Sequence, residues 1–354
     1  MLVRKDCRYF RGDVPCWPHK ESGVHCENCS CYSPVGKKIL IIKLGAIGDV
    51  IRTTPLLHKF KKKYPDGEIY WLTCFPEVLP SHVDNPLSFE LGNILYLQAT
   101  KFDLLINLDK DREACALANQ IEADLKKGFV LENGRCVPID DAAKHKWLTG
   151  ISDDLNKSNS KSYPEEIFEI CGYKYNKEKY IFEVNDKYEW NINEPRPLIG
   201  LNTGCGERWI TRLWPVKNWL QLSKELKASG YGVLLLGGES EDKKNKQISK
   251  ESGAAYLGHF PLDQFFSLVD QCDLVVTVVS MALHVAIGLG KKIVLLNNIF
   301  NRNEFELYGL GEIVEPDVSC KGCFKSNFDS KCEVPNCMEL ISPEKILETI
   351  QRLI

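Results

Sequence analysis

Short apolar runs alternate with amphipathic segments along most of the chain. The first run, residues 38–43, is apolar without alternation, as expected for a strand buried on both faces, and a helical pattern follows it. Further strands are predicted at 68–74, 93–97 and 102–108, and a further helix at 111–125. Strands that alternate with helices predict a parallel sheet with helices on both faces.

The pattern loosens and then resumes. Residues 128–180 are irregular, and SDDLNKSNSKS (152–162) has almost no apolar residue, so we expect an exposed loop there. The two prolines of residues 194–197 predict an interdomain linker. Beyond it, strands are predicted at 198–202, 231–236, 274–278 and 292–296, and helices at 216–227, 262–272 and 282–289.

Two doubly wound α/β halves are therefore expected, with ligands bound in a cleft between them. The length of 354 residues suits two domains of similar size. We predict a Cys-rich metal-binding segment (1–36), a first Rossmann-like domain (37–194), a second (195–340) that includes the Cys cluster 320–337, and a C-terminal helix (341–354).

Charge and hydropathy narrow the choice of partners. The formal net charge is −3, with 45 basic and 48 acidic residues, so no basic field favours nucleic acid. No apolar run approaches the ~20 residues that cross a bilayer, and the polar start does not resemble a signal peptide. The sequence thus predicts a cytoplasmic protein without a nucleic-acid partner.

Fifteen cysteines are unusual for that compartment, where thiols bind metals or are simply buried. The tail carries Cys320-x2-Cys323-x8-Cys332-x4-Cys337, a spacing typical of a structural tetrathiolate site. The head offers more ligands than one ion needs, with Cys7, Cys16, Cys26 and Cys29 preferred. Structural zinc is expected; iron, an iron–sulfur cluster and a site shared between head and tail are alternatives.

Three loops carry candidate binding chemistry. After the strand at 198–202, Thr203, Gly204 and Gly206 form a loop whose amides suit a diphosphate, and Arg208 and Arg212 supply guanidinium donors. The alternative for this loop is a plain flexible turn. In GGESED (237–242), Gly238 permits close approach and Glu239 suits ribose hydroxyls, unless these acids are only solvated.

The third loop leads into the helix near Met281. A helix N-terminus there, with Ser280, suits a phosphate or a nucleotide hydroxyl, although Ser280 alone could be a helix cap. His284 follows on an apolar face, where a packed core histidine is the alternative to a functional one. Near the start of the chain, Asp49 follows Gly45 and Gly48 and is either a cap or a residue aimed at a ligand.

Together these stretches resemble glycosyltransferase family 9, the ADP-heptose heptosyltransferases, over most of residues 38–354. They are ILIIKLGAIGDVIRTTPLL, IGLNTGCGERWITRLWP, LLLGGESED, LVVTVVSMALHVAIGLGKK and the tail CKGCF…C….CM. The resemblance implies a GT-B architecture, with the acceptor on the N-terminal domain and the sugar nucleotide on the C-terminal one. It also implies inversion of configuration without a catalytic metal.

Individual roles follow from the resemblance. Asp49 matches the proposed general base, with the amides of Gly45 and Gly48 steadying developing charge, and Arg212 matches a residue that contacts the donor diphosphate. His284 matches the histidine of a D-x-G-x-x-H signature. In this chain the signature reads Val279-Ser280-Met281-Ala282-Leu283-His284, so the Asp is replaced by Val279 and the Gly by Met281. We therefore expect altered donor preference or reduced activity.

The implied activity is inverting transfer of a heptose or related sugar from a nucleoside-diphosphate sugar, ADP-heptose, to a cell-envelope glycan such as the lipopolysaccharide core. A glycolipid acceptor of that kind implies peripheral contact with the inner face of the inner membrane. The alternative, motivated by Val279, is a metal-stapled nucleotide-binding or scaffold protein of the same fold with reduced or lost catalysis.

Overall fold

The computed structural model describes residues 1–184, 188–206, 209–325, 332 and 334–354. Packing divides the chain into two compact units. The first comprises Met1–Leu44, Leu56–Pro76 and Ser81–Asp140, and the second comprises Gly45–Pro55, Glu77–Pro80 and Asp141–Ile354. The units do not correspond to one cut in the sequence, because a short segment directly after the first strand packs with the second unit.

The first unit contains a six-stranded sheet in the order β3-β2-β1-β4-β5-β6. Its strands are β1 (Lys38–Ile42), β2 (Glu68–Thr73), β3 (Asn85–Ser88), β4 (Phe102–Asn107), β5 (Ala123–Glu132) and β6 (Arg135–Pro138). Strands β1 to β5 pair in parallel, and only the β5–β6 hairpin is antiparallel among these strands. The unbroken apolar run in β1 is explained by its central place, since residues 39–42 are fully buried.

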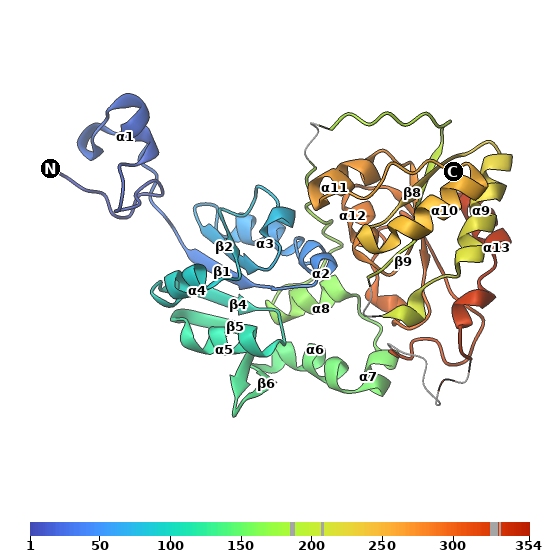
Figure 1. Cartoon of the computed structure of the whole chain (residues 1–354). Helices are drawn as coiled ribbons and strands as arrows, with labels where there is room; N and C mark the ends of the chain where they lie inside the picture. Colours follow the sequence, from blue (N-terminus) through green and yellow to red (C-terminus); the bar gives the residue numbers. More distant parts are fainter. Residues whose placement is uncertain (185–187, 207–208, 326–331, 333) are drawn as a thin grey trace. The chain divides into compact units, whose positions relative to one another are not determined.

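Helices α3 (Leu56–Lys63), α4 (Leu91–Gln98) and α5 (Arg112–Gln120) belong to this unit (Figure 1). The strand predicted at 93–97 is wrong, because these residues lie in α4, where Ile94 and Leu97 pack on the core three positions apart. The helix predicted at 111–125 is too long. It ends at Gln120, and Leu125 pairs with Leu104 in the sheet.

The second unit contains a fully parallel sheet in the order β11-β10-β9-β7-β8. Its strands are β7 (Leu198–Asn202), β8 (Gly232–Leu236), β9 (Leu274–Val278), β10 (Lys292–Leu296) and β11 (Gly311–Val314). The four strands predicted in this half are confirmed within a residue at each end. Both sheets are accompanied by helices, which confirms the predicted α/β class (Figure 1).

Helices of the second unit are α2 (Ile47–Ile51), α6 (Asp141–Ile151), α7 (Asp153–Ser158), α8 (Tyr163–Ile170), α9 (Val216–Ala228), α10 (Asp242–Ser252), α11 (Leu262–Asp270), α12 (Met281–Gly288) and α13 (Pro343–Leu353). The predicted apolar stripe of α9 is confirmed: Trp219, Leu222 and Leu226 are fully buried. Ile346 and Ile350 of α13 join the same core. The C-terminal helix is therefore part of this unit's packing.

The segment 152–162 is not the loop predicted from its polarity. It contains α7, whose N-cap Ser152 accepts a hydrogen bond from the Leu155 amide at 3.4 Å. The helix is largely exposed, which explains why its sequence lacks apolar residues.

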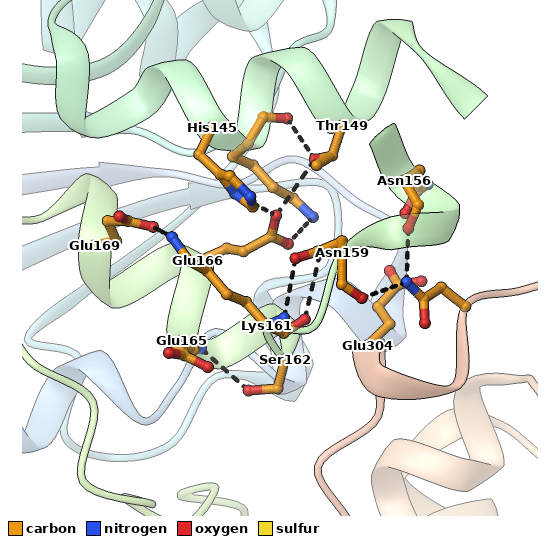
Figure 2. Close-up of polar contacts among 12 residues, drawn as sticks. His145, Thr149, Asn156, Asn159, Lys161, Ser162, Glu165, Glu166, Glu169 and Glu304 are labelled. Carbon is orange, nitrogen blue, oxygen red and sulfur yellow. Dashed lines mark hydrogen bonds and ion pairs between the residues drawn. The ribbon is translucent and has the colours of Figure 1, made fainter. Parts of the chain in front are cut away.

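A buried carboxylate joins α6 to α8. Glu166 is 1% exposed and lies 2.6 Å from Lys146 Nζ, and it accepts a hydrogen bond from Thr149 Oγ1 at 3.3 Å (Figure 2). His145 Nδ1 is also 3.3 Å from this carboxylate. A buried charge costs several kcal/mol unless it is paired in this way, so the cluster ties the two helices together.

The first 36 residues have little core of their own. They contain a short helix, α1 (Trp17–Ser22), and within residues 1–36, all of which the structure describes, only Pro18 is buried. Among the described residues no helix is long and apolar enough to cross a membrane.

Two glycines in the β5–β6 region give a matched test of the fold. Gly128 has φ +93°, and a Cβ there would come within 1.8 Å of Asn107 O in the neighbouring strand; Gly134, at the tip of the Asn133-Gly134 hairpin turn, has φ +75° with open space around it. We expect Gly128→Ala to lower the free energy of unfolding by at least ~3 kcal/mol and Gly134→Ala by only about 1 kcal/mol. Urea denaturation followed by tryptophan fluorescence measures both, and equal losses would contradict the assigned register of β4 against β5.

Candidate functional site

Helix α2 brings Asp49 into the second unit. The N-cap residue of α2 is Ala46, and Asp49 lies in the first turn of the helix rather than at the cap. Its side chain is 32% exposed, and its Oδ1 lies 2.8 Å from Arg52 Nη2 one turn later. Asp49 is thus a partly exposed carboxylate held in one orientation by an ion pair.

Arg52 itself is shared between two carboxylates. Its Nη2 lies 2.8 Å from Asp49 and 3.1 Å from Glu304 Oε1, and its guanidinium stacks 3.5 Å from the centre of the Tyr163 ring. The Arg52 side chain is 9% exposed. Although burial opposes its charge, the two carboxylates raise the pKa of Arg52, so the cation persists at every physiological pH.

His284, on α12, packs directly against α2. A Cβ at position 48 would come within 2.5 Å of His284 Cδ2, so only glycine allows this approach of the ring to the helix. His284 is 6% exposed, and its Nδ1 lies 3.3 Å from the hydroxyl of Tyr180. Burial, assisted by the Arg52 charge, lowers the pKa of His284 to about 3, so the ring is neutral near pH 7.

A pocket of about 340 Å³ lies at the carboxyl end of β7, β8 and β9. Three segments contribute to its lining: the loop after β7, the loop after β8 and the start of α12. Phe260, Leu262 and Phe265 add an apolar wall. A parallel sheet presents its loops at this edge, which is where such sheets usually bind ligands. Its mix of backbone amides, polar groups and aromatic rings suits a nucleotide.

The start of α12 has an arrangement that suits the binding of an anion. Ser280 occupies the N-cap position but makes no capping hydrogen bond; its Oγ instead lies 3.0 Å from Thr277 Oγ1 and 3.2 Å from Asn202 Nδ2. Ser280 and Met281 both line the pocket. The capping alternative for Ser280 therefore does not account for its side chain, and the first residues of the helix, whose amides have no partner within the helix, line a cavity.

Glu241, rather than Glu239, is the acidic residue of the pocket. Glu241 is 8% exposed and lines the cavity, whereas Glu239 is exposed and is not among the lining residues. Its carboxylate accepts hydrogen bonds from Gly238 N at 3.0 Å and from Ser240 Oγ at 3.0 Å. A Cβ on Gly204 would come within 2.0 Å of Glu241 Cδ, so this glycine makes room for the acid as well as for a ligand.

The remaining predicted residues either stabilise the loop after β7 or line the pocket. Thr203 is buried and donates to Asn245 Oδ1 at 2.6 Å. Arg212 does not line the pocket; its Nη2 donates to Cys205 O at 2.6 Å, which braces the loop. Gly206, Gly204 and Gly238 do line it. Arg208 lies outside the described residues. The Lys244 ammonium, which the sequence did not single out, donates to Thr203 O at 2.9 Å, and burial lowers its pKa.

Helix α12 connects the pocket to Asp49. Ser280 and Met281 at its start line the cavity, and His284, one turn later, touches Gly48 beside Asp49. Because one turn of an α-helix rises only ~5 Å, the candidate anion site and the contact with the helix that carries the candidate base lie at the two ends of a short stretch of α12. Val279, which replaces the signature Asp, is 9% exposed and adds no charge there.

The cysteine clusters each line one cavity. Cys320, Cys323, Cys332 and Cys337 surround a cavity of about 20 Å³, and the four preferred head cysteines line a wider one of about 400 Å³ together with His19 and His25. Across the described residues, however, no group of three or more His, Cys, Asp or Glu side chains is arranged closely enough to hold a metal ion. The predicted metal sites are therefore not shown by these side-chain positions.

Comparison with known proteins identifies the family. A model of "Glycosyltransferase family 9 (heptosyltransferase)" matches residues 95–325, about two-thirds of the chain. Lipopolysaccharide heptosyltransferase 2 of Escherichia coli K12 is 22% identical over 292 residues, which cover 73% of this chain and 82% of that protein. The chain belongs to glycosyltransferase family 9, and it is accordingly a glycosyltransferase.

Solved structures share the fold. The E. coli ADP-heptose LPS heptosyltransferase II superposes with a TM-score of 0.65 at 18% identity, covering 89% of this chain and 98% of that one. The iron-containing dodecameric glycosyltransferase TibC from enterotoxigenic E. coli H10407 gives a TM-score of 0.54 at 14% identity, covering 90% and 76%. At such identities the likeness establishes the architecture, which is that of the GT-B-like heptosyltransferases.

Sequence reasoning missed Arg52, Glu304 and Tyr163. The spacing of Asp49 and Arg52, three residues apart in a helix, was a signal for their ion pair. The sequence carried no signal for the contacts of Glu304 and Tyr163 with Arg52, because each residue is more than 100 positions from Arg52. These contacts arise only from tertiary packing.

The buried neutral His284 predicts a specific acid sensitivity. The pKa of this ring is about 6.5 in the unfolded chain and about 3 in the folded protein, so the unfolded chain takes up a proton first as the pH falls. The free energy of unfolding is therefore highest above pH 6.5 and decreases below it. Between pH 7.5 and pH 5.0 the wild type should lose about 2 kcal/mol through this residue, and His284→Gln should not show that loss. Urea denaturation at both pH values measures it. The exposed His58→Gln serves as the control, and a pH dependence unchanged by His284→Gln would contradict the prediction.

Proposed function

We propose that the protein is an inverting heptosyltransferase that uses ADP-heptose, with Asp49 as the general base. The acceptor hydroxyl oxygen forms a bond to the anomeric carbon while the bond from that carbon to the β-phosphate oxygen breaks. Asp49 takes the hydroxyl proton, and ADP leaves with the electron pair of the broken bond. Attack from the face opposite the leaving group inverts the configuration.

One observation carries the proposal: the helix whose N-terminus lines the nucleotide-sized pocket also packs, through His284, on the helix that carries Asp49. A base for this reaction must lie within reach of the anomeric carbon and apart from the phosphates. The ion pair with Arg52 gives the carboxylate a fixed orientation, and its 32% exposure leaves an oxygen accessible to an acceptor. The similarity to a lipopolysaccharide heptosyltransferase and to an ADP-heptose LPS heptosyltransferase supports ADP-heptose as the donor.

The pocket supports a specific arrangement of the donor. The adenine would contact the apolar wall at Phe260 and Phe265, the ribose hydroxyls would bind the Glu241 carboxylate, and the diphosphate would approach Ser280 and the start of α12. The acceptor we propose is a lipopolysaccharide core sugar or a related envelope glycan, as the relative's name suggests. Work on such a glycolipid implies a peripheral encounter with the membrane surface.

We also propose that the tail cysteines bind one structural metal ion. A cavity of about 20 Å³ lined by four thiols has room for a single ion. TibC, which shares the fold, is an iron-containing glycosyltransferase, and this supports iron as a candidate alongside zinc. The first 36 residues have a greater need of a bound metal than the tail, because their one buried residue cannot offset the conformational entropy lost on folding.

Asp49→Asn tests the catalytic proposal. The amide keeps the size of the side chain but cannot accept the proton, so transfer from ADP-heptose should fall at least ~100-fold while ADP binding is retained. Turnover is followed by ADP release in the presence of a heptose-accepting core glycan, and ADP binding by calorimetry. Asp153→Asn, an exposed acid in the first turn of α7, is the matched control. Normal turnover of the Asp49 variant would refute the assignment, and ADP binding without transfer in the wild type would favour the scaffold alternative.

Cysteine substitutions test the metal proposal. Protein purified without oxygen should contain metal, and replacing Cys320 and Cys323 by Ser should remove about one ion per chain and lower the melting temperature. Elemental analysis and thermal denaturation measure these effects. Cys26→Ser tests the head in the same way. Cys74→Ser, an exposed thiol outside both clusters, should change neither quantity. Metal-free wild-type protein of unchanged stability would end the proposal.

A further inference from the structure

The pairing of Arg52 with two carboxylates is unusual in its geometry. A guanidinium commonly meets one carboxylate with two parallel hydrogen bonds, but here the same nitrogen, Nη2, lies 2.8 Å from Asp49 Oδ1 and 3.1 Å from Glu304 Oε1. Among the described residues, the buried Nε of Arg52 has no hydrogen-bond partner. One nitrogen thus divides its attraction between two acids, and neither acid has the cation to itself.

This division matters for a base. A cation close to a carboxylate stabilises the ionised form and weakens the group as a proton acceptor. Such a pairing orients Asp49 but opposes the proton transfer that catalysis requires. A second carboxylate on the same cation reduces that opposition, because it offsets part of the positive potential at Asp49.

Three other described groups near this cluster do not supply the same negative charge. The neighbouring ring of His284 is neutral near pH 7, and burial raises the pKa of the Tyr180 hydroxyl, so that group is also uncharged. Lys146 lies on the Tyr163 ring at 4.8 Å and is itself paired with Glu166 at 2.6 Å. Within the described residues of this cluster, Glu304 is the acid that shares the Arg52 nitrogen with Asp49.

Glu304 is held in place by more than its ion pair. It ends the short helix Arg302–Glu304, whose N-cap Asn301 accepts a hydrogen bond from Asn303 N at 3.0 Å. Asn301 Nδ2 donates to Asn156 O at 2.6 Å and to Asn159 O at 2.7 Å, which anchors this turn to the end of α7 (Figure 2). A mobile surface acid would lose most of such an effect to solvent, whereas the Glu304 side chain is anchored and 19% exposed.

We propose that Glu304 is a positioning residue that keeps Asp49 basic by sharing the Arg52 guanidinium with it. The inference rests on the proposed role of Asp49. It assigns the Asp49–Arg52–Glu304 group two tasks: Arg52 fixes the direction of the Asp49 carboxylate, and Glu304 limits how strongly Arg52 holds its charge.

Glu304→Gln tests this directly, because it keeps the shape of the side chain and removes its charge. In the full-length protein labelled with carboxyl-¹³C aspartate, the Asp49 resonance, assigned by its loss in Asp49→Asn, should titrate about one pH unit lower in the variant. The acid limb of the pH–rate profile for ADP-heptose turnover should move in the same direction, with the maximal rate lowered about three- to tenfold. Glu304→Asp, which retains the charge, should restore most of both effects.

Glu306→Gln is the matched control, since Glu306 is a neighbouring acid whose described ion pair is with Lys177, at 3.9 Å, and not with Arg52. It should leave the Asp49 titration unchanged. A merely structural Glu304 would lower the melting temperature without moving the titration, and that result, or an equal shift in Glu306→Gln, would overturn the proposal. Failure of the base assignment is distinguished separately, because it appears as normal turnover in Asp49→Asn.

Discussion

The contact between the His284 ring and Gly48 fixes the position of α2 within the second unit. Because position 48 has no side chain, the His284 ring lies against the backbone of α2. Asp49, the next residue of α2, is therefore held beside α12, whose first residues line the pocket. The contact also explains why the histidine is buried and neutral, since a charged ring could not occupy that space at modest cost. In this chain His284 is therefore a packed residue that links the helix lining the pocket to the helix that carries Asp49.

Charge is the second constraint on this unit. Arg52 and Glu166 are both nearly inaccessible to water, and each is paired with oppositely charged groups from other elements. Tyr163 lies between them, with Arg52 on its ring at 3.5 Å and Lys146 at 4.8 Å. This connected set joins α2, α6, α8 and the turn at Glu304. Because removing one partner leaves a buried charge unpaired, the set resists rearrangement and keeps the Asp49 carboxylate in one direction.

The pocket at the carboxyl end of the second sheet is built differently, from backbone and small residues. Gly204 leaves space that the Glu241 side chain fills, and Asn202 joins the loop after β7 to Ser280 at the start of α12. Arg212 and Lys244 brace that loop through the carbonyls of Cys205 and Thr203. These two cations therefore act on the loop rather than from the pocket lining. Among the described residues, the backbone amides and the helix start are the main candidates for holding phosphate.

Sequence by itself determined the strands that are buried on both faces, because continuous apolar runs such as 39–42 and 293–296 have few other stable placements in an α/β fold. It also determined the glycine loops, the position of Asp49 after the first strand and the family resemblance. It failed at 93–97, where a four-residue apolar run (94–97) has no clear period, and at 152–162, where polarity hid an exposed helix. Only the tertiary structure decided which acid lines the pocket and which residues surround Arg52. Those choices depend on contacts between positions as distant as 52 and 304, and local periodicity carries no information about such pairs.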